Sequence, residues 1–424
     1  MTEADWPAQA AAADAADSLA AFRGRFRLPL APDGRPSIYL CGHSLGPMPV
    51  DATARVEDVL RPWAELAVRG HHQGPAPWLD FHAPFAAPLA ALVGAHPAEV
   101  VAMNTLTVNL HLLLVSFYRP TPGRFRILIE RGAFPSDRHA VVSQLRFHGL
   151  AESTALTEVA PQDGEALLRT ADLVAAIEAA GDSLALVLLP GVQYRTGQAL
   201  EVAAITRATR AVGAASGWDL AHAIGNVPLA LHDSGADFAV WCHYKYLCAG
   251  PGAVGGAFVH ERHGDGRGLP RFAGWWGHDV ASRFEMGPEF VPSPGAAGWQ
   301  VSNPPLLSLA PLAASLALFE AAGAARLRAK SLALTAFARR LIEARCGGRV
   351  EILTPVADAE RGCQLSLRIA GGAGRAVFAS LTTAGVIGDW REPDVLRLAP
   401  APLYNTFGEV ERAVSLLAQA LPPR

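Results

Sequence analysis

A lysine stands between two tyrosines in CHYKYLCAGPG, residues 242–252, where its amine could do chemistry. Asp219 and His222 stand 26 and 23 residues before Lys245, in the stretch WDLAHAIGNVP. A carboxylate at the end of an apolar strand is costly to bury, so Asp219 needs a cationic partner. The AGPG turn lets the backbone approach a ligand closely. An arbitrary lysine is most often a solvated charge, but these neighbours favour a functional one.

One ligand, pyridoxal phosphate, accounts for all these features. Its aldehyde needs a lysine to form a Schiff base, its ring nitrogen needs a carboxylate to stay protonated, and its phosphate needs hydroxyl and backbone N–H groups. In an open α/β sheet, ligands bind at the carboxyl ends of the strands. The residues by themselves therefore predict a Schiff-base enzyme and leave its reaction open.

Short apolar runs, separated by amphipathic stretches, must position these residues. We interpret as buried strands the runs 126–130, 184–190, 215–221, 238–242 and 255–260, with helices over 163–181 and 202–215. Such alternation predicts a mostly parallel sheet covered on both faces. From residue 306 a long helical region precedes two strands and a helix near 375–384, which predicts a smaller α+β domain.

Composition limits the possible functions. The chain has 424 residues, half of them hydrophobic, with a formal net charge of −3, which argues against nucleic acid as a partner. Five cysteines without a CxxC pair indicate neither a disulfide framework nor a structural zinc site. Residues 1–22 are acidic and helix-prone, unlike a secretory signal, and no apolar run reaches the length of a membrane span. We therefore expect a cytoplasmic protein without a membrane segment.

Eight stretches, in order along nearly the whole chain, resemble the kynureninase family. They are YLCGHSLGPMP (39–49), LTVNLHLLLVSFY (106–118), FPSDRHA (134–140), WDLAHAIGNVPL (218–229), YKYLCAGPG (244–252), GWWGH (274–278), QVSNPP (300–305) and LRLAPAPLYN (396–405). The family consists of fold-type I pyridoxal-phosphate enzymes that hydrolyse L-kynurenine to anthranilate and L-alanine, in tryptophan catabolism and NAD biosynthesis. Each stretch alone is moderately specific, and the set is highly specific.

The resemblance implies a large domain with a mostly parallel seven-stranded sheet and a smaller α+β C-terminal domain. Residues 1–45 would be an N-terminal segment packing on the small domain, 46–305 the cofactor-binding domain and 306–424 the small domain. It also implies a homodimer with composite active sites. The substrate would be L-kynurenine and also 3-hydroxy-L-kynurenine, with the preference between them left open.

The resemblance further implies roles for individual residues. Lys245 would form the Schiff base and later move protons. Tyr244 would bind the phosphate and act as the acid/base for hydration of the substrate carbonyl and for protonation of the β-carbon. Asp219 would pair with the pyridine nitrogen, and His222 would support Asp219 or the ring oxygen of the cofactor. The other implied cofactor contacts are Leu106, Thr107, Phe134, Pro135, Ser136 and Asp137, together with Trp275 and Asn303 from the partner subunit.

The implied substrate contacts are Ser44, His71 and Asn303 near the aromatic ring and Arg397 at the carboxylate. A guanidinium suits a bidentate carboxylate contact, and Arg397 interrupts the apolar run VLRLA, which argues against a surface role. His71 and His72 are adjacent, so they would not share a face. No acidic cluster accompanies them, and we expect no metal site.

Three positions depart from the family pattern: His43 replaces a common asparagine, His243 a small hydroxyl or thiol residue, and Pro190 a hydroxyl residue. Two alternatives also stay open. One is another enzyme of this fold, an aminotransferase or a cysteine desulfurase-like lyase, although desulfurases usually have histidine where this chain has Tyr244. The other is a non-catalytic homologue that binds the cofactor or an amino acid, which would not need the whole set of residues.

Overall fold

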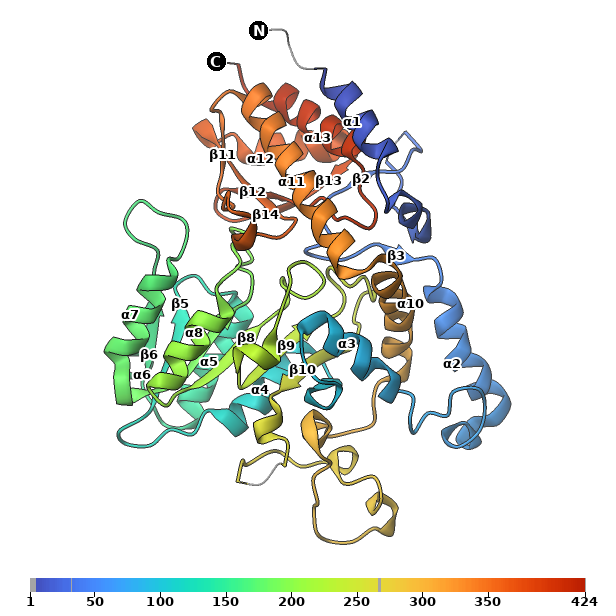
Figure 1. The fold of residues 1–424 in the computed structure, drawn as a ribbon, viewed down its shortest axis with the longest axis vertical. Helices are drawn as coiled ribbons and strands as arrows, with labels where there is room; N and C mark the ends of the chain where they lie inside the picture. Colours follow the sequence, from blue (N-terminus) through green and yellow to red (C-terminus); the bar gives the residue numbers. More distant parts are fainter. Residues whose placement is uncertain (1–4, 32, 266–267, 424) are drawn as a thin grey trace.

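The computed structural model describes residues 5–31, 33–265 and 268–423. Its centre is a seven-stranded sheet in the order β4-β10-β9-β8-β7-β5-β6 (Figure 1). The strands from β9 to β6 run parallel, and β10 is antiparallel to both its neighbours. The predicted mostly parallel seven-stranded sheet is confirmed. Its strands are β4 (Val100–Ala102), β5 (Arg126–Glu130), β6 (Leu156–Val159), β7 (Leu184–Pro190), β8 (Ala215–Asp219), β9 (Phe238–Cys242) and β10 (Gly255–Val259).

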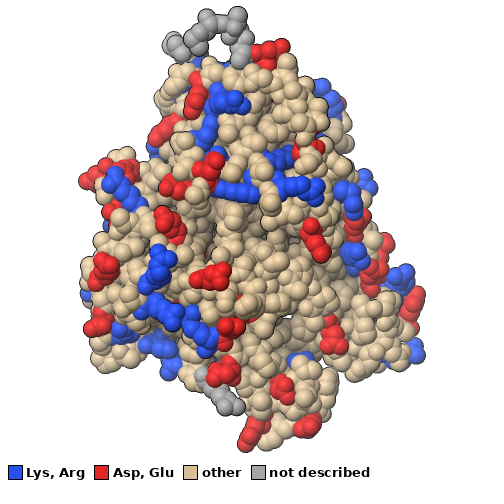
Figure 2. Space-filling view, in the orientation of Figure 1, with Lys and Arg blue, Asp and Glu red and all other residues tan. Residues whose placement is uncertain are grey.

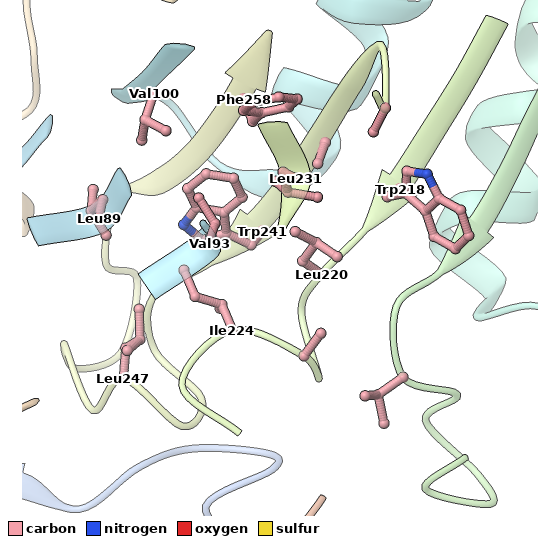
Figure 3. Packing of buried hydrophobic residues seen from close by; sticks show 14 of the residues in the cluster. Leu89, Val93, Val100, Trp218, Leu220, Ile224, Leu231, Trp241, Leu247 and Phe258 are labelled. Carbon is pink, nitrogen blue, oxygen red and sulfur yellow. The ribbon is translucent and has the colours of Figure 1, made fainter. Parts of the chain in front are cut away.

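The strands are apolar on both faces because helices cover both faces. In β7, Val187 belongs to one hydrophobic cluster and Leu188 to another, since successive side chains of a strand point to opposite faces. Figure 3 shows the first cluster, where Trp241 and Phe258 of the sheet lie near Leu89. Its helices are α3 (Ala86–Val93), α7 (Thr170–Ala180), α8 (Val202–Ala211) and α10 (Leu306–Ala322), and those of the opposite face are α4 (Leu106–Phe117) and α5 (Pro135–Phe147).

A second, smaller sheet is antiparallel and has the order β11-β12-β15-β14. It lies near both termini in Figure 1. The predicted smaller α+β part is confirmed. The N-terminal helix contributes Ala10 to its core, and Ile38 pairs with Val386. These elements are α1 (Trp6–Ala15), β2 (Ile38–Tyr39), α11 (Ala324–Cys346), β11 (Val350–Ile352), β12 (Leu365–Ile369), α12 (Gly374–Thr383), β13 (Val386–Ile387), β14 (Asp389–Arg391), β15 (Val395–Leu398) and α13 (Phe407–Ala420).

The long helical region predicted after residue 306 is two helices. Gly323 separates α10 from α11 with φ +75°, a conformation that side chains disfavour, and the helices bend by 83° there. Of the helices that the structure describes, none alone is long and apolar enough to span a membrane, and only this bent pair reaches that length and composition together. Leu309 and Phe319 of α10 pack into the core of the large sheet, and the domain boundaries at residues 45 and 305 stay a prediction.

The helix predicted over 163–181 begins only at Thr170, because turns occupy the residues before it. The remaining strands and α-helices are β1 (Phe26–Arg27), which pairs with β3 (Met48–Pro49), and α2 (Ala52–Leu66), α6 (Glu152–Ala155) and α9 (Leu231–Ser234).

Acidic and basic side chains are interspersed on the face shown in Figure 2. All five cysteines are free and buried.

Candidate active site

Lys245 lies in the loop after β9, at the carboxyl end of that strand. Its Nζ is 3.1 Å from Nε2 of His222, which follows the neighbouring parallel strand β8. The sheet therefore brings these two residues to the same edge, as the sequence predicts. Gly250 and Gly252 of the AGPG turn have φ +92° and +70°, so both positions require glycine.

The N-terminal segment holds the lysine loop from the other side. The Gly46 N–H donates to the Tyr244 carbonyl at 2.8 Å. A Cβ at Gly46 would lie only 2.4 Å from the carbonyl oxygen of Lys245. Glycine is needed here because the two backbones touch.

His222 is neutral in this environment. Burial, and then the charge of Lys245, lowers the pKa of His222 well below its ordinary value. Its Nε2 therefore accepts a hydrogen bond from the Lys245 ammonium, which leaves the proton of the ring on Nδ1. This Nδ1 is buried and has no partner within the described chain, so it is a donor available to a ligand oxygen.

Three carboxyl groups, those of Glu130, Asp137 and Asp219, line the same cavity as Lys245. Asp219 ends β8 and accepts from the Ala221 N–H at 2.7 Å. Burial, and then the negative charge of Asp219, raises the pKa of Asp137 well above its ordinary value, and Asp137 Oδ1 has no partner among the described residues. Burial also raises the pKa of Glu130, at the end of β5, to about 8. Neighbouring carboxyl groups do not all ionise together, because their negative charges repel one another. This group of carboxyls is therefore suited to bind a cation.

Glu130 is a member of this group that the sequence analysis missed, although it ends the apolar run RILIE. Its partner is Gln193, whose Nε2 donates at 3.3 Å, and it is only 2% exposed. The folded chain therefore favours the protonated form of Glu130, whereas the unfolded chain releases that proton near the ordinary pKa of 4.5.

We expect Glu130→Gln to stabilise the cofactor-free protein at alkaline pH. The wild type loses stability as the pH rises from about 4.5 to about 8, because only its unfolded state ionises over this range. Glutamine does not titrate, so the variant's advantage grows through this window to a few kcal/mol, on the order of 1.4 kcal/mol per pKa unit. Urea unfolding of both proteins at pH 5 and pH 9 measures it. An equal difference at both pH values would contradict the assignment.

The N-termini of two helices lie at the cavity that Lys245 lines. Neither α4, which begins at Leu106, nor α5, which begins at Pro135, has a side-chain cap. The hydroxyl groups of Thr107 and Ser136, in their first turns, lie 2.8 Å apart. Uncapped N–H groups, the positive ends of the helix dipoles and two hydroxyls suit a phosphate.

One cavity thus gathers most of the predicted cofactor contacts. The Phe134 ring lies 5.7 Å and the Tyr244 ring 5.9 Å from Lys245 Nζ, measured to the ring centroids. Tyr194, which the sequence analysis did not single out, packs edge-on against Phe134. The predicted residues that line this cavity are Leu106, Thr107, Phe134, Ser136, Asp137, Asp219, His222, Tyr244 and Lys245, and Pro190 lines it as well.

Arg397 is close to this region but engaged with its own chain. It is fully buried in β15, where its Nε donates to Asp389 at 2.9 Å and its Nη1 to the Tyr194 carbonyl at 2.7 Å. Asp389, a second residue that the sequence analysis missed, therefore fixes the guanidinium. Ser44 is half-buried and does not line the cavity.

Four other predicted contacts are not among the residues that line the cavity of their own chain: Pro135, His71, Trp275 and Asn303. His71 packs against Trp78, and Asn303 is exposed. Trp275 is 44% exposed, and its indole N–H donates to the Arg283 carbonyl at 3.0 Å. Its neighbour in GWWGH, Trp276, is buried in its own chain.

Comparison with known proteins identifies the family. The family described as Kynureninase C-terminal domain matches residues 327–417. Kynureninase of Xanthomonas axonopodis pv. citri is 58% identical over 98% of both chains, and that of Stenotrophomonas maltophilia is 57% identical over 96% of both. The chain belongs to the kynureninase family. The predicted class, a pyridoxal-phosphate-dependent hydrolase, is confirmed, and its cofactor is pyridoxal phosphate.

Solved structures of low sequence identity share the fold. A C-DES mutant with glycine covalently linked to its PLP cofactor has a TM-score of 0.77 at 19% identity, covering 93% of this chain and 98% of its own. The cysteine desulfurase CsdA of Escherichia coli has a TM-score of 0.75 at 17% identity, covering 95% and 98%. The predicted fold-type I architecture is confirmed.

The cavity of this chain fits pyridoxal phosphate. The unpartnered His222 Nδ1 can donate to an oxygen of the ring, and the carboxyl wall of Asp137 and Asp219 suits a protonated ring nitrogen. The uncapped starts of α4 and α5 suit the phosphate. Each chemical group of the cofactor therefore has a matching set of side chains.

Proposed function

We propose that this chain hydrolyses L-kynurenine and 3-hydroxy-L-kynurenine to anthranilate or 3-hydroxyanthranilate and L-alanine, using Lys245 as the covalent attachment point of its cofactor. The observation that carries this proposal is the contact between Lys245 Nζ and neutral His222, beside a wall of carboxyl groups, in a chain of the kynureninase family. The bound cofactor supplies an electron-withdrawing ring that stabilises negative charge on the substrate's carbon atoms.

Lys245 and Asp219 carry the central steps in this proposal. Lys245 would hold the cofactor through its amine, and the same amine would remove and return protons at the substrate's carbon atoms. Asp219 would keep a proton on the ring nitrogen, and burial, followed by the charge of Asp219, raises the pKa of Asp137, so Asp137 would keep its own proton. Phe134 would stack on the cofactor ring, and Pro135 begins the helix that carries Ser136.

Tyr244 is the proposed acid for the carbon–carbon cleavage. Burial, and then the neighbouring Cys242, raises the pKa of Tyr244, so its phenol keeps its proton. A protonated phenol beside the cavity can bind the phosphate. It can also donate a proton to the substrate's β-carbon when the carbon–carbon bond breaks. Arg397, preoriented by Asp389, would take the substrate's carboxylate.

The simplest test supplies the holoenzyme with L-kynurenine and follows anthranilate fluorescence. Sulfide release from cysteine and keto-acid release from an amino acid are measured beside it. We expect anthranilate and alanine in equal amounts. Sulfide as the main product would support the desulfurase alternative, although all five cysteines are buried. Cofactor binding without any product would support the non-catalytic one. The cytoplasmic location stays a prediction.

We also propose that the enzyme is a homodimer whose active sites use residues of both chains. His71, Trp275 and Asn303 do not reach the cavity of their own chain, so the site lacks them unless a second copy supplies them. His71 lines a separate groove of about 530 Å³ together with Trp63 and Leu307, which are 59% and 44% exposed. A second copy would cover these apolar side chains.

Mixing two inactive variants tests this arrangement. If Asn303 acts in the partner's site, a heterodimer of Lys245→Ala and Asn303→Ala chains has one site with both lesions and one with neither. We expect up to about half of the wild-type activity per heterodimer. Subunit exchange is verified with two different tags. Heterodimers that form and stay inactive would show that Asn303 acts in its own chain.

A further inference from the structure

We propose that His96, His232 and Glu261 form a binding site for a divalent cation of the zinc type, at the sheet edge opposite Lys245. His96 and His232 precede the amino ends of β4 and β9, and Glu261 follows the antiparallel β10. The three residues stand 136 and 29 positions apart, so no local sequence motif marks them. The fold alone brings them together.

The spacing of the three ligand atoms is close to the spacing of ligands around a bound zinc ion. One ligand atom from each of His96, His232 and Glu261 lies within 4.8 Å of the other two. Two ligands of a tetrahedral zinc stand about 3.4 Å apart, given bonds of about 2.1 Å. His96 and Glu261 are exposed, so small rotations of their side chains can close the difference. A water molecule would complete the tetrahedron.

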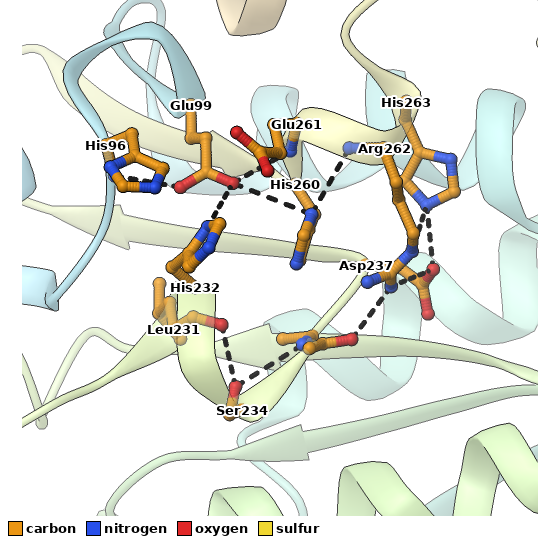
Figure 4. A network of polar contacts seen from close by, with 12 residues as sticks. His96, Glu99, Leu231, His232, Ser234, Asp237, His260, Glu261, Arg262 and His263 are labelled. Atoms are coloured by element: carbon orange, nitrogen blue, oxygen red, sulfur yellow. Dashed lines mark hydrogen bonds and ion pairs between the residues drawn. The ribbon is translucent and has the colours of Figure 1, made fainter.

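A buried carboxylate fixes the central ligand in the required orientation. Glu99 is 0% exposed and accepts hydrogen bonds from the backbone N–H groups of His96 and Glu261, both at 2.8 Å (Figure 4). Each oxygen of Glu99 thus accepts from a backbone N–H, one from His96 and one from Glu261, so Glu99 holds these two segments together.

The contact with Glu99 determines which nitrogen of His232 faces a metal. Glu99 Oε1 lies 3.0 Å from His232 Nδ1, and because a carboxylate only accepts, Nδ1 must donate. Nε2 is then the nitrogen of His232 that is left for a metal. A carboxylate behind a histidine is the arrangement that orients metal-binding imidazoles and increases their basicity.

His260 supports this ring rather than binding the ion. It stacks on His232 with centroids 5.0 Å apart and planes inclined by 26°. Its Nδ1 accepts from the Arg262 N–H at 3.2 Å, so that lone pair is already used. The ring of His232 is therefore held between His260 and Glu99.

A second cluster, Cys41 with His43 and Asp389, has similar spacing but a different electrostatic environment. Asp389 already pairs with Arg397 at 2.8 Å and with Arg391 at 3.0 Å. Two guanidinium groups oppose a cation there. The cluster around His232 contains the carboxyl groups of Glu99 and Glu261, which favour a cation, and the nearby Arg262 pairs with Asp237 at 2.6 Å.

Zinc titration of the EDTA-treated, desalted holoenzyme tests the proposal, using a chromophoric chelator as competitor. We expect one Zn²⁺ per chain, and a rise in Tm because the ion joins three segments. Co²⁺ in place of Zn²⁺ should give the visible absorption of a tetrahedral site. His232→Ala should abolish binding, and Glu99→Gln should weaken it about tenfold.

His148→Ala is the matched control, because it removes another exposed imidazole and should bind Zn²⁺ as the wild type does. If His232→Ala does not fold, the variants His96→Ala and Glu261→Gln test the proposal instead. Both change exposed side chains, so both should fold. The proposal is overturned if the wild type binds no Zn²⁺ at micromolar concentration. It is equally overturned if binding survives in folded His96→Ala and Glu261→Gln proteins.

Discussion

Lys245→Ala should lower anthranilate formation by at least about a thousandfold, because the amine that attaches the cofactor and moves protons is lost. The fold should survive, since Lys245 is only half-buried and its contact is a hydrogen bond to His222. Steady-state fluorescence with L-kynurenine measures the activity. Borohydride reduction followed by peptide mapping measures the attachment of the cofactor.

The chain offers a matched control because it contains two lysines, Lys245 and Lys330. Lys330 is buried and lies 2.7 Å from Asp17 in an ion pair. Lys330→Met should therefore lower the free energy of unfolding by about 3 kcal/mol, since it leaves a buried carboxylate unpaired. It should retain the reducible attachment. Labelling of Lys330, or sustained turnover by Lys245→Ala, would reject the assignment of Lys245.

Asp219→Ala should weaken cofactor binding by about a hundredfold and lower kcat by at least about a thousandfold. The ring nitrogen would lose the carboxylate that keeps it protonated, so the ring would withdraw electrons less well. Equilibrium dialysis of the cofactor and single-turnover kinetics measure the two effects separately.

The same substitution should change the ionisation of Asp137. The charge of Asp219 is, after burial, the main cause that raises the pKa of Asp137. Without Asp219, Asp137 should ionise at lower pH and partly replace it, so residual cofactor binding should increase with pH. Asp137→Asn in the Asp219→Ala background should remove that increase. Kinetics close to wild type in Asp219→Ala would mean that Asp219 has a structural task instead.

The sequence predicts the parallel sheet well because its buried strands are apolar throughout. The runs 126–130, 184–190 and 238–242 match β5, β7 and β9 residue for residue. Helix ends were predicted less well, because a break such as Gly323 depends on how α10 and α11 pack. A periodic apolar pattern continues across such a glycine, so the pattern alone does not locate the bend.

The candidate site likewise contains residues that the sequence predicts and residues that it does not. Asp219, His222 and Lys245 are predictable because strand order brings the ends of β8 and β9 together. Glu130 and Asp389 were missed because nothing near them in the sequence marks their partners. Gln193 and Arg397, which they contact, come from other elements. Such pairs require the three-dimensional arrangement.

The short segment between Leu40 and Gly46 acts as a mechanical link between the two sheets. The Leu40 N–H donates to Ile387 at 2.8 Å, and the Ala399 N–H donates to Leu40 at 2.8 Å, which fastens one end to the small sheet. Gly46 fastens the other end to the backbone at Tyr244. A rotation of the small sheet must therefore strain this segment or displace the lysine loop, so slow amide exchange at Gly46 would report how tightly the two movements are coupled.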